Sequence, residues 1–181
     1  MPKPFLSILL PASLTAEDPD LRQKTLKVGL VGRALAIFRV DKVVIYFDDD
    51  PRTQDQKAEA DLIAKLLSYM ETPQYLRKLL IPRAKELRYA GLLPPLRTPH
   101  HPRCDEKGRS GDYREAVVIE VGKGGSLLEL GLPEKGFSHK KLKVGQRLTV
   151  KIGKRIARDR VAVEPVEKGE VGEYWGYEVS I

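Results

Sequence analysis

The sequence contains no asparagine and very little cysteine, methionine or tryptophan. Its 181 residues include one Cys, two Met and one Trp. A single cysteine excludes an intrachain disulfide, so we expect a reducing, cytoplasmic compartment. Few heat-labile residues beside abundant Lys, Arg, Glu and Pro are typical of thermophilic proteins. We therefore expect a thermophilic source.

Long apolar runs are missing as well. The apolar run nearest the start, Phe5 to Leu10, ends at Pro11 and is too short for a signal-peptide core or a membrane span. We expect no membrane association. With 41% hydrophobic and 31% charged residues, the composition is that of a folded protein.

Positive charge is concentrated in one segment. The 32 Lys and Arg exceed the 25 Asp and Glu by seven, whereas the segment from His139 to Arg160 holds nine Lys and Arg against one Asp, a local charge of +8. A solvated thermophile surface is one interpretation. The clustering favours contact with a polyanion. We predict that RNA is bound by Lys140, Lys141, Lys143, Arg147, Lys151, Lys154, Arg155, Arg158 and Arg160.

The first half of the chain has the pattern of an α/β protein. The apolar runs Phe5–Leu10 and Val43–Phe47 predict strands buried on both faces of a parallel sheet, and the spacing in Leu21–Phe38 predicts the helix between them. Strand, helix and strand in this order predict a right-handed βαβ unit. Apolar positions in Lys57–Met70 predict a second helix, and Thr72–Pro73 a further helix start.

The second half has the pattern of a small β domain. Four prolines and two glycines between Gly91 and Asp112 exclude regular structure there. Beyond them, short strands with a period of two predict a small barrel of the oligonucleotide-binding (OB) type; the expected strands are 116–121, 126–130, 148–152 and 161–163. The predicted division is an α/β part at 1–92, a crossover at 93–112, an OB-like barrel at 113–172 and a return strand at 173–181.

Several segments resemble the SPOUT-class (α/β-knot) RNA methyltransferases, in particular the archaeal and eukaryotic branch with an inserted OB-like barrel. The longest is Tyr89-Ala-Gly-Leu-Leu-Pro-Pro-Leu-Arg-Thr-Pro-His-His-Pro102, and the others are 24–27, 32–41, 72–78 and 173–179. The resemblance implies an archaeal type of protein. It also implies that Arg97, His100 and His101 lie near the RNA, and we add Lys24, Lys27 and Arg33 of the first predicted helix to the RNA-binding candidates.

The same resemblance led us to expect an incomplete SPOUT-like α/β half-domain with an inserted barrel. In the family, the segment after the return strand supplies the knot and the loops that hold S-adenosylmethionine, and this sequence ends before it. We therefore expect a non-catalytic RNA-binding protein of the ribosome, one that binds large-subunit rRNA or is ribosome-associated, with no cofactor. The alternative is half of a split or truncated S-adenosylmethionine-dependent rRNA methyltransferase, completed by a partner chain.

A small parallel sheet rarely buries both faces unaided. We therefore expect a partner protein or a ribosomal surface to cover it.

Other polar and aromatic groups leave alternatives open. His100 and His101 can equally hold the proline-rich loop by hydrogen bonds. With Cys104 and Asp105 they lack the second ligand pair of a zinc site, so we predict no metal. Asp48–Asp50 could hold Mg²⁺ or form an ordinary turn before Pro51. Base stacking and a core or interface role remain open for Tyr174, Trp175 and Tyr177.

Overall fold

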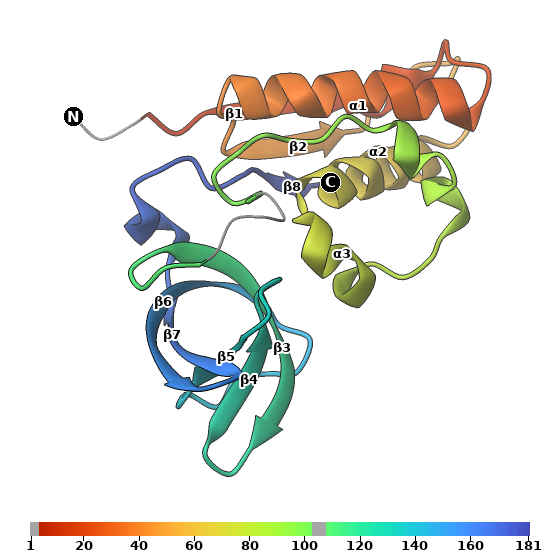
Figure 1. Ribbon diagram of the computed structural model, residues 1–181. Helices are drawn as coiled ribbons and strands as arrows, with labels where there is room; N and C mark the ends of the chain where they lie inside the picture. Colours follow the sequence, from red (N-terminus) through yellow and green to blue (C-terminus); the bar gives the residue numbers. More distant parts are fainter. Residues whose placement is uncertain (1–3, 103–107) are drawn as a thin grey trace. The chain divides into compact units, whose positions relative to one another are not determined.

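The computed structural model describes residues 4–102 and 108–181, which form two compact units (Figure 1). We call the first the sheet unit; it comprises the described residues of Met1–Thr72, Arg83–Thr98 and Gly176–Ile181. The second, the barrel unit, comprises the described residues of Pro73–Pro82 and Pro99–Trp175. Within the described ranges, no helix is both long and apolar enough to cross a membrane.

The sheet unit is built on three parallel strands, in the order β1-β2-β8. In the register of the sheet, Leu9 lies opposite Val44, and Val44 lies opposite Ser180. Two helices, α1 and α2, pack with this sheet, as the apolar spacing predicted. The bounds are β1 Ser7–Pro11, α1 Leu21–Ile37, β2 Lys42–Tyr46, α2 Gln56–Glu71 and β8 Glu178–Ser180.

Within the described residues of the sheet unit, the helices cover one face of this sheet. Leu10, Val43 and Ile45 are buried in one cluster with the apolar side chains of both helices. On the opposite face, Leu9 is 65% exposed and Tyr46 is 42% exposed. The prediction that the first strand is buried on both faces is therefore wrong, because α1 and α2 contribute to the same cluster.

A glycine allows α1 to approach the segment after η3 (Ala90–Leu92). A Cβ on Gly29 would lie 2.9 Å from Cδ of Pro94 and 3.1 Å from Cδ2 of Leu93. We expect Gly29→Val to lower the free energy of unfolding by about 1–3 kcal/mol, because the rigid proline ring cannot yield without moving backbone. Arg22→Val, at an exposed position of the same helix, is the control. Thermal unfolding followed by circular dichroism measures both, and equal midpoints would contradict the expectation.

The barrel unit contains five strands that close in the order β3-β4-β5-β7-β6, with β6 pairing back to β3. All strand pairs are antiparallel except β5 with β7. The core includes Ala116, Val118, Leu128 and Val150. The strand bounds are β3 Tyr113–Gly122, β4 Gly125–Glu129, β5 Lys135–Ser138, β6 Arg147–Ala157 and β7 Arg160–Val166.

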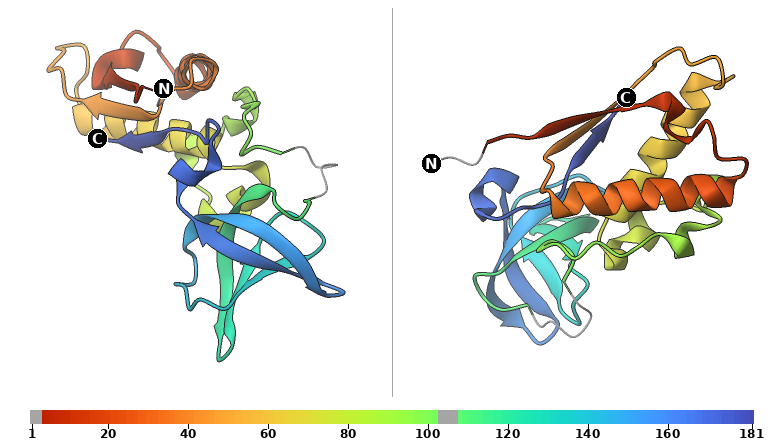
Figure 2. Two further views of the ribbon diagram at one scale, coloured as in Figure 1. Left: turned by 90° about the vertical axis from the view of Figure 1, so that its left-hand side faces the viewer. Right: turned by 90° about the horizontal axis from the view of Figure 1, so that it is seen from above.

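Further elements of the described fold are the helix α3 and short 3₁₀ helices, among them η2, Lys85–Leu87. The helix α3, Gln74–Leu80, belongs to the barrel unit, where the hydroxyl of Tyr75 donates a hydrogen bond of 2.8 Å to the carbonyl oxygen of Glu115. The turns η1, Ala12–Thr15, and η4, Lys168–Val171, are short 3₁₀ helices. The strands β6 and β7 form a long hairpin that extends outward from the barrel (Figure 2, left).

Candidate nucleic-acid interface

The end of the β6–β7 hairpin is exposed and basic. Ile152 is 2% exposed and points into the barrel. From Lys154 to Arg160 every residue is exposed, and the pairing of β6 with β7 shifts register on both sides of Arg155. Such irregularities increase strand twist and change the direction of side chains. The exposed basic side chains of this hairpin, which we call the basic hairpin, are Lys151, Lys154, Arg155, Arg158 and Arg160.

The cations of the basic hairpin differ in their acidic neighbours. Arg155 pairs with Glu134, and Nε of Arg160 lies 3.9 Å from Oδ2 of Asp159. Among residues 4–102 and 108–181, no carboxylate forms an ion pair with Lys151, Lys154 or Arg158. Their positive charges therefore remain available to an anionic partner.

A second group of predicted cations follows β5. Lys140, Lys141 and Lys143 are exposed, and no ion pair involves them within the described part of the chain. The hydroxyl of the buried Ser126 donates to the carbonyl oxygen of Lys140 and accepts from the amide of Leu142, both at 2.9 Å. The backbone carrying these lysines is thus fixed to β4.

Two of the predicted RNA-binding lysines are neutralised inside the sheet unit. Lys24 pairs with Glu59, and both side chains are mostly buried. Nζ of Lys27 lies 2.7 Å from Oδ2 of Asp18 and also donates to the carbonyl oxygen of Leu14. These contacts tie α1 to neighbouring elements, so a structural role is sufficient for both lysines.

Two predicted arginines come together at a groove of the sheet unit. Arg33 of α1 and Arg97 of the segment after η3 line a cavity of about 520 Å³. Both guanidinium groups are exposed, and no ion pair is formed by either within the described chain. The remaining lining residues are apolar: Ala36, Ile37, Pro95 and Leu96.

One of the two predicted histidines is buried, whereas the other is partly exposed. His100 is completely buried, with its ring centroid 4.3 Å from that of His101 and 5.9 Å from that of Trp175. This burial favours the interpretation that His100 holds the loop. Cys104 and Asp105 lie outside the described residues. Within the described ranges, no group of three or more His, Cys, Asp or Glu residues could hold a metal ion.

A buried carboxylate joins β3, β6 and Trp175 within the barrel unit. Glu115 is 1% exposed, and its carboxylate accepts hydrogen bonds from Nε of Arg147 at 2.5 Å, the hydroxyl of Thr149 at 2.6 Å and Nε1 of Trp175 at 2.7 Å. Trp175 is therefore an internal residue, and base stacking by this ring is excluded. Arg147 belongs to the predicted RNA-binding set, but its charge is offset by Glu115.

The pKa of Glu115 results from opposing effects. Burial raises the pKa, but the charge of Arg147 and the hydrogen bonds from Thr149, Arg147 and Trp175 outweigh burial and lower it. The carboxylate therefore stays ionised at neutral pH. The sequence contained no signal for this network, because its members are far apart along the chain and a single Glu in a strand is ordinary.

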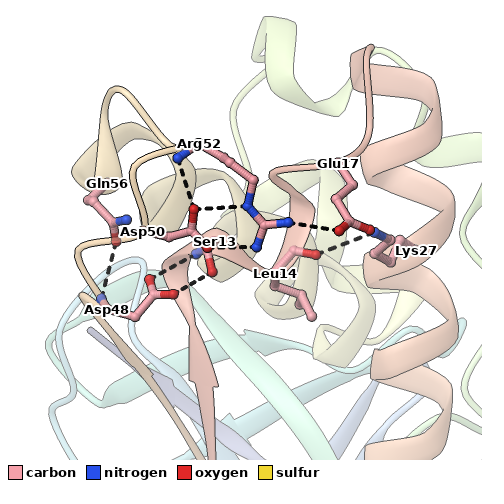
Figure 3. A network of polar contacts seen from close by, with 8 residues as sticks. All are labelled: Ser13, Leu14, Glu17, Lys27, Asp48, Asp50, Arg52 and Gln56. Carbon is pink, nitrogen blue, oxygen red and sulfur yellow. Dashed lines mark hydrogen bonds and ion pairs between the residues drawn. The ribbon is translucent and has the colours of Figure 1, made fainter.

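The loops after β1 and β2 are held together by carboxylates (Figure 3). Asp48 accepts a short hydrogen bond from the hydroxyl of Ser13 and one of 3.2 Å from the Ser13 amide. The hydroxyl contact is the main cause of the lowered pKa of Asp48. Asp48 also contacts the side-chain amide of Gln56 (Figure 3).

Arg52 binds a second carboxylate of this loop, that of Asp50. Its Nε and Nη2 atoms bind Asp50 at 3.0 and 2.7 Å, and Nη1 binds Glu17 at 2.8 Å (Figure 3). Hydrogen bonds from Arg52 lower the pKa of Asp50 to about 2. With Ser13 and Arg52 as partners, Asp48 and Asp50 serve as turn-forming residues, which favours the turn interpretation over Mg²⁺.

A protein-family model with the description "Putative RNA methyltransferase" matches residues 5–181. The chain belongs to this RNA methyltransferase family. The resemblance drawn from the sequence is confirmed at this level. Over 97% of its length the chain is 34% identical to the 28S rRNA (uridine-N(3))-methyltransferases of Mus musculus and Homo sapiens, and 36% identical to that of Drosophila melanogaster.

The chain spans about half the length of these curated relatives: 50%, 51% and 41% respectively. Among solved structures, an uncharacterized protein of Methanocaldococcus jannaschii has 16% sequence identity and a TM-score of 0.31 over 35% of this chain. That likeness is too low to support a statement about the fold.

The expectation of a non-catalytic RNA-binding protein is wrong. Relatives that are 34–36% identical over nearly the whole chain carry the name of a methyltransferase. The expectation depended on the point where the sequence ends. An end point carries no information on the chemistry of a protein of this methyltransferase family.

S-Adenosylmethionine, which the family resemblance implies, does not fit the groove of the sheet unit. Its methyl-bearing sulfonium is positively charged, and Arg33 and Arg97 place two further positive charges on the groove. The apolar lining offers no carboxylate to offset them. This groove therefore suits an anion better than the methyl donor.

Proposed function

We propose that the protein containing this chain is an S-adenosylmethionine-dependent methyltransferase that modifies N3 of a uridine in ribosomal RNA. The observation that carries the proposal is the similarity, over 97% of this chain, to proteins named 28S rRNA (uridine-N(3))-methyltransferase. In such a reaction the cofactor supplies an electrophilic methyl group. The described residues of this chain supply the binding of RNA.

The barrel unit is proposed as an OB-like module that binds RNA. Its closed five-stranded topology and its outward basic hairpin support this proposal, since OB barrels bind oligonucleotides through one strand face and adjacent loops. The predicted contacts are Lys140, Lys141, Lys143, Lys151, Lys154, Arg155, Arg158 and Arg160. Arg147 is a weaker candidate, because Glu115 neutralises it.

The sheet unit is proposed as the SPOUT-like part of the enzyme. Its parallel βαβ arrangement supports this proposal. Arg33 and Arg97 would provide a second phosphate contact, whereas Lys24 and Lys27 are weaker candidates because both are paired. The exposed side chains of Leu9 and Tyr46, on the open face of the sheet, support the prediction that a partner covers this face. The domain boundaries and the cytoplasmic location stay predictions.

The activity is tested directly. The purified protein is incubated with methyl-labelled S-adenosylmethionine and unmodified large-subunit rRNA, and the digested nucleosides are separated by mass spectrometry. We expect label in N3-methyluridine. Label in another nucleoside would contradict the proposed acceptor, and rRNA that is bound but remains unlabelled would contradict the proposed enzyme. A DNA of the same sequence is the control substrate.

A further inference from the structure

The outer face of the barrel carries an aromatic side chain, Phe137, that is partly exposed and does not belong to the core cluster. Along β5 the buried Gly136 faces inward, since a Cβ there would lie 3.0 Å from Val163 of the core cluster. Side chains alternate across a strand, so Phe137 points outward. It lies between Leu127 of β4 and Ala162 of β7 in the register of the barrel.

Small residues border Phe137 at the turn with Gly124 and on β7 at Ala162, whereas Leu127 borders it on β4. A Cβ on Gly124 would lie 3.9 Å from Cζ of Phe137, so no side chain covers the ring from that turn. Gly153 of β6 lies beside Ala162. A Cβ on Gly153 would be 3.3 Å from the Cβ of Ala162. Glycine and alanine at these neighbouring positions leave a low surface next to the phenyl ring, on which a flat group can lie.

A second ring borders this surface. His139 is exposed, and its ring centroid is 5.1 Å from that of Phe137 in an edge-on arrangement with an interplanar angle of 86°. Because the two rings are nearly perpendicular, they do not stack face to face on each other. Two rings at right angles form the floor and wall of a site for one planar group.

Positive charges stand at the rim of these rings. Lys140 and Lys141 follow His139 directly, and Lys123 precedes Gly124. All three are exposed, and none forms an ion pair within the described chain. The hydrogen bonds between Ser126 and the backbone of Lys140 and Leu142 fix this rim. Because the rim is already ordered, less conformational entropy is lost on binding.

We propose that Phe137 and His139 form a stacking site for an unpaired RNA base, with Lys123, Lys140 and Lys141 contacting the flanking phosphates. Aromatic side chains stack on unpaired bases of any type, whereas bases inside a duplex are already stacked and cannot be reached. Charge complementarity between the cationic rim and the phosphate backbone supports RNA as the occupant. The site selects single-stranded RNA over duplex RNA. This inference deepens the proposed function and rests on its RNA substrate.

The test measures affinity for a short oligouridylate, for the same strand paired with its complement, and for a strand with abasic residues. We expect Phe137→Ala to weaken binding of the single strand by roughly 5- to 100-fold. Binding of the abasic strand should not change. Because stacking is not ionic, the dependence on salt should keep its slope, whereas Lys140→Gln with Lys141→Gln should lower the slope by roughly 1.4.

Controls separate binding from folding. Phe137→Tyr retains a ring and should retain affinity, and Phe47→Ala removes an exposed ring of the sheet unit and should have no effect. If Phe137→Ala fails to fold, Phe137→Leu replaces it, because leucine preserves apolar volume without an aromatic face. The same loss of affinity for the single strand is expected. Unchanged affinity of the folded variant, or equal loss for the abasic strand, overturns the inference.

The outcome is independent of methyl transfer, since no methyl donor is present in the assay. Failure of the proposed enzyme activity with an intact Phe137 effect would therefore refute the function and leave the stacking site.

Discussion

Removing three cations from the basic hairpin is expected to weaken RNA binding by roughly 100-fold at ~0.1 M salt. The variant combines Lys151→Gln, Lys154→Gln and Arg158→Gln, three exposed residues that form no ion pair within the described chain. Each phosphate contact with single-stranded RNA contributes about 0.7 to the slope of log affinity against log salt. Loss of three contacts therefore lowers the slope by roughly two.

A matched control keeps the same change of net charge. Lys57→Gln, Arg83→Gln and Lys85→Gln also remove two lysines and one arginine, all exposed and all in the sheet unit. Filter binding or fluorescence anisotropy at several salt concentrations gives both affinity and slope. If the control lost as much affinity as the hairpin variant, general charge would explain binding and the hairpin would have no special role.

Much of the sheet unit could be predicted from the sequence because its elements have strong periodicity. The expected helix Leu21–Phe38 ends one residue later than α1, and Lys57–Met70 lies within α2. The local pattern also predicts which face of a helix is apolar. It does not show which face of a sheet the helix covers, and for this reason the exposure of Leu9 was not foreseen.

One strand of the barrel was missed entirely. β5 has the sequence Lys-Gly-Phe-Ser, with a single large apolar residue and a glycine at its inward position. Gly136 fits there because Val163 and Leu130 fill the space that a side chain would need. Its inward side is thus defined by residues distant in the sequence, which a reading of local alternation cannot detect.

The sequence could indicate candidate RNA contacts only where charge clusters locally. The exposed cations of the basic hairpin lie close together in the sequence, so the local density of Lys and Arg indicated them. Pairing with distant carboxylates is invisible in such a pattern, which explains why Lys24, Lys27 and Arg147 were placed in the same set. Burial of His100 likewise depends on tertiary contacts with Trp175.

Glu115→Ala is expected to lower the free energy of unfolding of the barrel unit by about 3–5 kcal/mol, the cost of removing one partner of a buried ion pair. The substitution leaves Arg147 without this carboxylate and removes the acceptor of Thr149 and Trp175. Trp175 is the single tryptophan of the sequence, so its fluorescence during urea unfolding reports on this network directly. Glu120→Ala, exposed on the same strand, should cost no more than about 0.5 kcal/mol.

The same network predicts a dependence of stability on pH. The pKa of Glu115 is lowered in the folded state from its ordinary value of 4.5. Its ionisation therefore stabilises the fold above pH 4.5, and this contribution is lost as the pH falls through the lower folded-state pKa. The difference in stability between the wild type and Glu115→Gln should accordingly be full near neutral pH and shrink in acid. A difference that stayed constant down to low pH would show that shape and hydrogen bonding, rather than the charge of Glu115, hold Arg147 and Trp175 in place.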